Sequence, residues 1–425
     1  MKVSVSSSEF NPQDRLVVAL DVGKEKLTCY SPFVRNGLPM VMVDEVENRS
    51  NAVRGAFLEY GKLAAKEGYR GVHILCEPTG GYEKNLLRIA RELGFSTAYV
   101  NSESVAKLRV VRQNDTGKTD ELDPRIIHLA GKDGRQLTVR CLPVPYEQLR
   151  VLNGIYEQED KSCVTAKNCL HETLLQLFPD LRLSSAQLFS RCGEALIGAF
   201  GADPHAIVKA GWPAFAQRLK ARCGLLRQKT LEGIWHAAQV NHLHVVGFEV
   251  AAVLRDRVRQ LYADWQQHQA RKEALKKQMR ELYRSLPEYE QLRTIPNVQE
   301  LLLARLIGET GPLADYANGR RLLRMAGLNL CERKSGKYKG QTKISKKGRS
   351  LLRKILFQIT ALCLVKPGGL YSGYYTRRKL AGAIGMKLTT AVMRKFLTAV
   401  LGIYRSAVPF QVERLCTSAS AFQAA

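Results

Sequence analysis

The segment RLVVALDVGKEKLTCYSP, residues 15–32, contains two β-rich runs joined by a glycine-containing turn. We therefore expect two strands, over residues 15–22 and 26–32. The next run, GLPMVMVDEV at residues 37–46, has the same character and predicts a third strand. Three short strands in succession favour a meander at the start of the chain.

Helical and strand patterns alternate after the meander. Apolar residues recur at helical spacing over residues 51–67, and the run VHILCE at 72–77 predicts a buried strand. A helix that ends at Gly94, a strand at 96–101 and another helix within 119–134 are expected next. A meander followed by a βαβα alternation predicts an α/β domain over residues 1–145.

Long helices are predicted for the middle of the chain, residues 146–286. Apolar positions recur between residues 254 and 282 in alternating steps of four and three, which is the coiled-coil period. A comparable row runs over residues 149–177. The pattern leaves open whether these helices form a hairpin within the chain or a dimerisation arm. His268 and Lys272 on the seam would set the register in either case.

The C-terminal part, residues 287–405, is predicted to be a helical domain interrupted by glycines, followed by a flexible tail over residues 406–425. The most basic run of this part, residues 320–354, contains only one acid, Glu332. The thirteen lysines and arginines of this run are Arg320, Arg321, Arg324, Arg333, Lys334, Lys337, Lys339, Lys343, Lys346, Lys347, Arg349, Arg353 and Lys354. Such a dense run, interrupted by Gly336, Gly340 and Gly348, is typical of a loop that contacts the phosphate backbone of nucleic acid. The alternative is that the run is only a solvent-exposed charged surface.

Composition narrows the class of protein. The 425 residues include 65 Lys and Arg against 39 Asp and Glu, a net charge of +26, with 45% hydrophobic residues. This is a globular composition, and its clustered positive charge predicts a nucleic-acid partner. No window reaches the roughly 18 to 20 apolar residues of a membrane span, and the ten cysteines lack zinc-site spacing. We expect a cytoplasmic, nucleoid-associated protein without a membrane partner.

Four acids are candidates for a metal site. Asp21 ends the first strand, Glu77 ends the strand VHILCE, and Asp120 and Asp123 are three residues apart on a predicted helix. Buried acids are costly in so basic a protein unless a cation pairs with them, and Mg²⁺ takes carboxylate oxygens. In the alternative interpretation Asp21 and Glu77 cap turns, Asp123 pairs with Arg125 or Lys118, and no metal binds.

Three segments together resemble a known family. They are RLVVALDVGKEKLTCY (15–30), CEPTGGYEKNLLRIARELGFSTAYVN (76–101) and GKTDELDPRIIHLA (117–130), and they resemble the RuvC-like, RNase H-fold domain of the DEDD insertion-sequence transposases, the group that includes the Piv/MooV invertases. The C-terminal segments 292–313 and 320–356 resemble the family's second hallmark. The chain departs from the family pattern at Pro124, where many members have alanine, and at Asn297, where a glycine is usual.

The resemblance implies a site and partners. Asp21, Glu77, Asp120 and Asp123 would be catalytic and would bind Mg²⁺ or Mn²⁺. Ser335, in the SG of the C-terminal signature, would attack the scissile phosphate and form a covalent serine–DNA intermediate. Members of the family are associated with a structured noncoding RNA that pairs with donor and target DNA, so the resemblance implies a guide RNA as well as DNA. A recombinase that holds two duplexes is expected to be a homo-oligomer, a dimer or tetramer.

The basic residues expected to contact nucleic acid are Lys118, Arg320, Arg321, Arg333, Lys334, Lys337, Lys339, Lys343, Lys346, Lys347 and Arg349. Ser345 and Ser350 are chemical rivals of Ser335, but Ser345 is expected to cap a helix that follows it.

Three functions remain open from the sequence. The first is a transposase, a site-specific recombinase with a serine nucleophile. The second is a RuvC-like junction nuclease in which water attacks, and the third is a catalytically inactive nucleic-acid-binding protein. A tyrosine recombinase built on Tyr371, Tyr374 or Tyr375 is disfavoured, because no Arg/His constellation accompanies these tyrosines.

Overall fold

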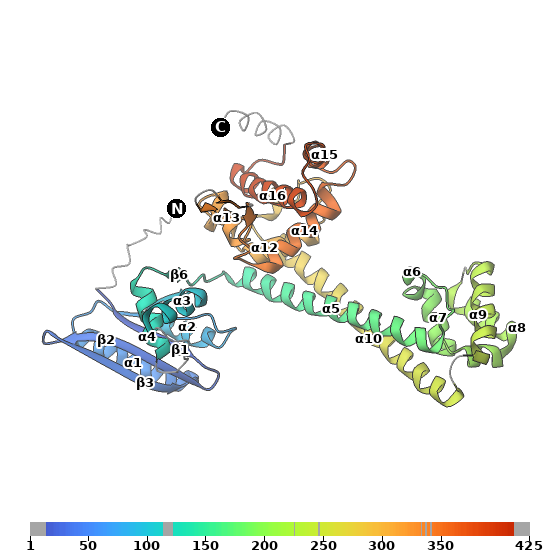
Figure 1. The fold of residues 1–425 in the computed structure, drawn as a ribbon, viewed down its shortest axis with the longest axis horizontal. Helices are drawn as coiled ribbons and strands as arrows, with labels where there is room; N and C mark the ends of the chain where they lie inside the picture. Colours follow the sequence, from blue (N-terminus) through green and yellow to red (C-terminus); the bar gives the residue numbers. More distant parts are fainter. Residues whose placement is uncertain are drawn as a thin grey trace. The chain divides into compact units, whose positions relative to one another are not determined.

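The computed structural model describes residues 14–113, 122–224, 226–244, 247–332, 334–335, 338–340 and 342–411. The chain divides into two compact units, Met1–Cys141 and Leu142–Ala425, and each is described by itself (Figure 1). Within the described ranges no helix is long and apolar enough to cross a membrane.

Unit 1 contains a six-stranded mixed sheet in the order β3-β2-β1-β4-β5-β6. The first three strands form the predicted antiparallel meander, β4 and β5 run parallel to β1, and β6 runs antiparallel to β5. The strands are β1 (Leu16–Val22), β2 (Lys26–Arg35), β3 (Leu38–Glu47), β4 (Val72–Cys76), β5 (Ser96–Val100) and β6 (Gln136–Thr138). The α/β class predicted for this part of the chain is confirmed.

Two pairs of helices cover the two faces of this sheet. They are α1 (Ser50–Lys66) with α2 (Glu83–Glu92), and α3 (Ser102–Gln113) with α4 (Leu122–Lys132). Side chains of β1 alternate between the faces: Leu16, Val18 and Leu20 pack with α1 and α2, whereas Val17 and Ala19 pack with α3 and α4. Residue 21 therefore continues the α4 face of the sheet.

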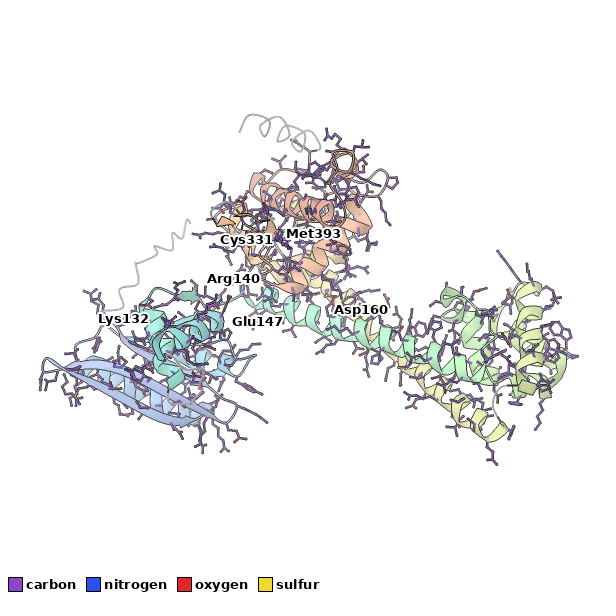
Figure 2. The ribbon with its side chains drawn as sticks, in the orientation of Figure 1. Lys132, Arg140, Glu147, Asp160, Cys331 and Met393 are labelled. Carbon is purple, nitrogen blue, oxygen red and sulfur yellow. The ribbon has the colours of Figure 1, made fainter. Side chains whose placement is uncertain are left out.

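Unit 2 is built on two long helices, α5 (Val144–Leu177) and α10 (Phe248–Arg284), which pack against each other (Figure 1). The predicted seam residues His268 and Lys272 face α5. His268 Nδ1 lies 2.6 Å from Glu159 Oε2, and Lys272 Nζ lies 2.6 Å from Asp160 Oδ1 (Asp160 is labelled in Figure 2). The two helices thus pair within the chain, and the polar contacts of His268 and Lys272 hold their register.

Two hydrophobic cores lie along this helix pair. One contains Leu170, Leu177 and Val258 together with the shorter helices of the distal module, which we define as residues 178–247. These helices are α6 (Ser185–Leu188), α7 (Arg191–Phe200), α8 (Pro204–Cys223) and α9 (Gln228–His244). The other core contains Leu149 and Tyr283 together with the C-terminal helices.

The C-terminal elements form the second of these cores. They are α11 (Tyr289–Leu292), α12 (Glu300–Thr310), a 3-10 turn (Leu313–Asp315), α13 (Gly319–Met325), the strands β7 (Leu330–Cys331), β8 (Lys334–Ser335), β9 (Tyr338–Lys339) and β10 (Lys343–Ile344), α14 (Ser350–Ile359), a π-helical turn (Thr360–Leu364), α15 (Ser372–Leu380) and α16 (Met386–Ser406). Asn297, at the turn before α12, has a φ of +62°, a left-handed conformation that asparagine tolerates.

A buried ion-pair network joins α5 to α12. The side chain of Arg305 is 3% exposed and pairs with Glu157, which also pairs with Lys354. Arg305 Nε donates a hydrogen bond to Asn153 Oδ1 (2.9 Å), and its Nη1 donates one to Gln358 Oε1 (3.0 Å). The network therefore satisfies the buried charges with several hydrogen bonds.

Replacing Arg305 by Met is expected to lower the free energy of unfolding of unit 2 by about 3 kcal/mol, because Asn153 and Glu157 lose a buried partner. Chemical denaturation of the full chain would measure it. The matched control is Arg284→Met, which removes an exposed ion pair with Glu300 and should cost less than about 1 kcal/mol. Equal losses in the two variants would contradict a structural role for the buried network.

Candidate functional site

Asp21, Glu77 and Asp123 lie at one edge of the unit 1 sheet. β1 pairs in parallel with β4 up to Leu20 opposite Cys76, so Asp21 and Glu77 are the next residues of neighbouring strands. Because Val17, Ala19 and Leu75 point to the α4 face, Asp21 and Glu77 continue that face.

The third acid comes from the helix that covers this face. Asp123 is 5% exposed and lies in the first turn of α4, one turn before Ile126 and Ile127, which pack on the sheet. Pro124 is accommodated because the first helical turn has no intrahelical N–H bond to lose. Asp120 lies outside the described residues.

The pKa of Glu77 shows that Asp21, Glu77 and Asp123 lie close to one another. Burial raises the pKa of the Glu77 carboxyl, and the negative charges of Asp123 and Asp21 raise it further. A hydrogen bond from Ser102 and the positive charge of Arg109 act in the opposite direction. Three carboxylates are therefore close enough to repel one another, an arrangement that a cation would stabilise.

Arg109, on α3, is the protein's own cation at this edge. Its Nη2 pairs with Asp123 Oδ1, and the Arg109 side chain is 17% exposed. The alternative ion-pair interpretation from the sequence named Arg125 or Lys118 for Asp123; Arg125 is exposed and Lys118 lies outside the described residues. The Nε of Arg109 is buried without a hydrogen-bond partner in the described structure. We did not identify Arg109 from the sequence.

The acids fit a hard divalent cation by donor type and by grouping. Carboxylate oxygens are the ligands that Mg²⁺ and Mn²⁺ prefer, and the repulsion around Glu77 favours a positive ion. Within the described residues no group of three or more His, Cys, Asp or Glu side chains is already arranged as a metal site. Asp123 is already paired with Arg109, so a divalent ion bound here would share Asp123 with that guanidinium.

A second buried acid shapes the loop that follows Glu77. Glu83, at the start of α2, is 5% exposed and accepts hydrogen bonds from Gly81 N (2.9 Å) and Thr79 Oγ1 (3.0 Å). Burial raises the pKa of Glu83, but these hydrogen bonds outweigh it and lower the pKa overall. Sequence reasoning missed this acid, although an acid in the first turn of a helix is a recognised signal of the helix N-terminus.

Ser335 belongs to a β-hairpin of unit 2, which the structure defines by its backbone. Lys334 and Ser335 pair with Lys339 and Tyr338 in an antiparallel ladder. Closer to the core, Cys331, labelled in Figure 2, pairs with Lys343 in a second ladder. Ser335 is the last paired residue before Gly336 and Lys337, which lie outside the described residues. The serine therefore sits near the end of a narrow two-stranded element.

At the base of this hairpin, the backbone at residues 325–327 packs closely against the backbone at residues 346–349. Lys346 N donates to Gly327 O (3.0 Å), and Arg349 N donates to Met325 O (2.9 Å). A Cβ at Gly348 would lie 2.5 Å from Gly327 N, so this position requires glycine. Gly348, predicted as a break in a phosphate-following loop, has a packing role.

Ser345 does not cap a helix, which corrects one sequence prediction. Helix α14 begins at Ser350, with Arg349 as its N-cap residue. Ser345 Oγ instead hydrogen-bonds Asn329 Oδ1 (2.6 Å), on the opposite side of the hairpin base. The prediction was wrong because a serine hydroxyl at this place in the sequence can either cap a helix or, as here, form a hydrogen bond across the base of the hairpin.

Most described members of the predicted nucleic-acid surface are exposed. Arg320 and Arg321 begin α13, and Lys343, Lys346 and Lys347 follow the hairpin, all with exposed side chains. Arg349 is half-buried, because its Nε lies 2.6 Å from the buried carboxylate of Glu309. Arg333 and Lys337 lie outside the described residues, and Lys334 and Lys339 are placed by backbone pairing.

The sequence contains a further signal of charge in this region. The eighty residues between Glu332 and Glu413 include eighteen Lys or Arg and no Asp or Glu. Carboxylates are absent over a span that forms the hairpin, α14, α15 and α16. The exposed cations of this span favour a polyanionic partner.

Comparison with protein families decides the class of the protein. A DEDD transposase model of the IS110 family matches residues 18–179, which include Asp21, Glu77, Asp120 and Asp123. A second model, described as the transposase IS116/IS110/IS902 family, matches residues 289–375, which include Ser335. The chain carries the two domains of IS110-family transposases. It is a DNA transposase, an enzyme of DNA recombination.

A search of curated proteins finds no match to this transposase. Three solved structures of Ppx/GppA proteins from Aquifex aeolicus show weak similarity. The type II variant of the phosphatase has 14% identity and a TM-score of 0.17, covering 23% of this chain and 40% of that chain. The other two have 13% and 11% identity, each with a TM-score of 0.19, and cover 54% and 58% of this chain and 92% and 98% of theirs. Similarity at this level supports no conclusion about fold or activity.

Replacing Glu77 by Gln is expected to raise the melting temperature of the metal-free transposase by a few degrees, because one of three repelling charges is removed at a partly buried position. Mg²⁺ should raise the melting temperature of the wild type but not that of the variant. Thermal unfolding of the full chain with and without Mg²⁺ measures both effects. The control Glu92→Gln, at an exposed acid of α2, should keep the Mg²⁺ effect. An Mg²⁺ effect that survives Glu77→Gln would exclude this carboxylate as a ligand.

Proposed function

We propose that this transposase cuts and rejoins DNA at the ends of an insertion sequence, with a DEDD metal site in unit 1 and Ser335 of unit 2 as nucleophile. One observation carries the proposal: Asp21, Glu77 and Asp123 lie on one face at one edge of the sheet, and their charges act on one another. The family domains supply the reaction class.

The acids are proposed to hold Mg²⁺, or Mn²⁺, with Asp120 as the fourth ligand. A bound divalent cation supplies Lewis-acid stabilisation of the phosphate oxygens. Arg109 holds Asp123 against the sheet, and Ser102 orients Glu77 through its hydrogen bond. These two residues position ligands and are not themselves proposed as ligands.

Ser335 is proposed to form a covalent bond to DNA. Its hydroxyl oxygen loses a proton and bonds to phosphorus, while the bond from phosphorus to one sugar oxygen breaks and that oxygen takes up a proton. The reverse reaction with another strand's hydroxyl rejoins DNA without an external energy source. The basic side chains around the hairpin stabilise the negative charge of the phosphate during both cleavage and rejoining.

Unit 1 is proposed to have the RuvC-like RNase H fold. Its order of three antiparallel strands followed by parallel β4 and β5 supports this assignment. We further propose that the chain belongs to the Piv/MooV group, acts as a homo-oligomer and is directed by a structured guide RNA. The exposed basic residues Arg320, Arg321, Lys343, Lys346 and Lys347 would bind phosphates of DNA or RNA.

Wild-type protein, Ser335→Ala and Asp123→Asn should be incubated with Mg²⁺, copurifying RNA and labelled DNA that carries the element's junction. We expect joined strands from the wild type alone. Cleaved DNA from Ser335→Ala would instead indicate a nuclease in which water attacks. DNA binding without cleavage by any of the three proteins would indicate an inactive nucleic-acid-binding protein.

A further inference from the structure

The distal module, residues 178–247, is a folded part of the chain to which neither family model assigns a role. The two models match residues 18–179 and 289–375, so the module lies almost wholly between them. Phe200, Phe215 and Leu219 are at most 2% exposed in its core. It is therefore a folded segment with surfaces of its own (α6 to α9, Figure 1).

Positive charge gathers on one part of this module. Residues 204–231 contain six lysines and arginines and no acid. We define the distal basic cluster as the exposed residues Arg191, Arg218, Lys220, Arg222, Arg227 and Lys229. In the part of the chain that the structure describes, none of the six has an ion pair with a carboxylate, whereas nearby Arg182 and Arg255 pair with Asp180 and Asp203.

A hollow in the protein surface separates the helices that carry the cluster. Its volume is about 450 Å³, and Arg191, Arg227, Ser190 and Thr230 contribute to its lining. Guanidinium groups and hydroxyls are hydrogen-bond donors, and a phosphate group presents acceptors only. The lining thus matches a phosphodiester in charge and in hydrogen-bonding capacity.

Stabilisation of a helix end does not account for the whole cluster. Lys220 and Arg222 lie in the last turn of α8, where positive charge favours the helix dipole. Arg191 instead begins α7, and Arg227 lies between α8 and α9. A Cβ built at Gly198 of α7 would lie 2.6 Å from Arg222 Nη1, so the guanidinium of Arg222 reaches across to α7. Three separate segments bring their cations to one place.

We infer that the distal basic cluster binds the backbone phosphates of a nucleic-acid duplex. Grouped like charges repel one another, and in the described structure none of the six forms an ion pair with a carboxylate, so a polyanion is the partner that relieves the repulsion. Duplex DNA and base-paired RNA share this backbone. The inference rests on the proposed function only for the presence of a nucleic-acid partner, and it adds a contact outside both transposase domains.

The test compares the full-length wild type with the variant Arg191→Gln/Arg222→Gln/Arg227→Gln. Binding of a labelled DNA duplex and of an RNA duplex of the same sequence is measured between about 50 and 200 mM salt. The matched control is Lys161→Gln/Arg257→Gln/Arg280→Gln, which removes the same charge from exposed sites of unit 2 outside the distal module. Melting temperatures establish that all the proteins are folded.

The cluster variant should bind at least one duplex roughly tenfold more weakly, and the slope of log affinity against log salt should fall by about 2 to 3. The control should change that slope by less than about 1. A loss with only one duplex identifies the source of the phosphates. An unchanged slope with both duplexes would overturn the inference while leaving the proposed function intact. A wild type that binds neither duplex would contradict both.

Discussion

Strand joining by Ser335→Ala should fall by roughly 10⁴-fold or more, because a methyl group cannot form the bond to phosphorus. The effect should be catalytic and not structural, since Ser335 is near the end of the hairpin and away from the crossing at Gly327 and Gly348. Product yield with labelled junction DNA measures it, and DNA affinity should stay within about twofold of the wild type.

The matched control is Ser350→Ala. Ser350 is an exposed serine in the same basic region and begins α14, so its hydroxyl is a chemical rival of Ser335 without a place in the hairpin. This variant should keep wild-type joining. Joining that survives Ser335→Ala but is lost in Ser350→Ala would move the nucleophile to the start of α14.

Asp21→Asn should lower strand cleavage by roughly 10³-fold, equal to about 4 kcal/mol of transition-state stabilisation. Asp21 and Glu77 are neighbours where the paired strands β1 and β4 end. The uncharged amide of the Asn variant therefore weakens the cation site at this place. Initial cleavage rates over a range of Mg²⁺ and Mn²⁺ concentrations measure the loss, and a high metal concentration should recover only part of it.

Asp44→Asn is the control for Asp21→Asn. Asp44 is an acid of the same sheet, on β3, whose carboxylate accepts a hydrogen bond from Tyr60 (2.7 Å) on the opposite face. Its loss should affect stability and not metal dependence. If both variants cleaved DNA at equal rates, the carboxylates at the edge of the sheet would have no special role.

The part of the fold with regular apolar periodicity was predictable. The apolar runs at residues 16–20 and 72–76 predict buried strands, and the strands form at Leu16–Val22 and Val72–Cys76, next to Asp21 and Glu77. The short strand β6, three residues long, and helix α3 were missed. Helix α3 exposes Val110 and Val111, so its apolar residues do not follow one face.

Contacts between residues distant in the sequence were beyond prediction. Arg305 meets Glu157 and Arg349 meets Glu309 through the packing of helices, and the sequence gives no indication of these partners. Arg109 was missed for the same reason, since its role depends on where α3 crosses α4. The charge of the distal module was visible in the sequence, but convergence of its cations required the arrangement of α7, α8 and α9.

Mapping the residue that carries DNA tests the central claim most directly. Wild-type transposase is trapped on junction DNA with Mg²⁺, denatured and digested, and the peptide bearing a nucleotide is identified by mass spectrometry. The account predicts a phosphodiester on Ser335, absent from Asp21→Asn. Attachment at Tyr371, Tyr374 or Tyr375, or cleaved DNA with no attached peptide, would contradict it.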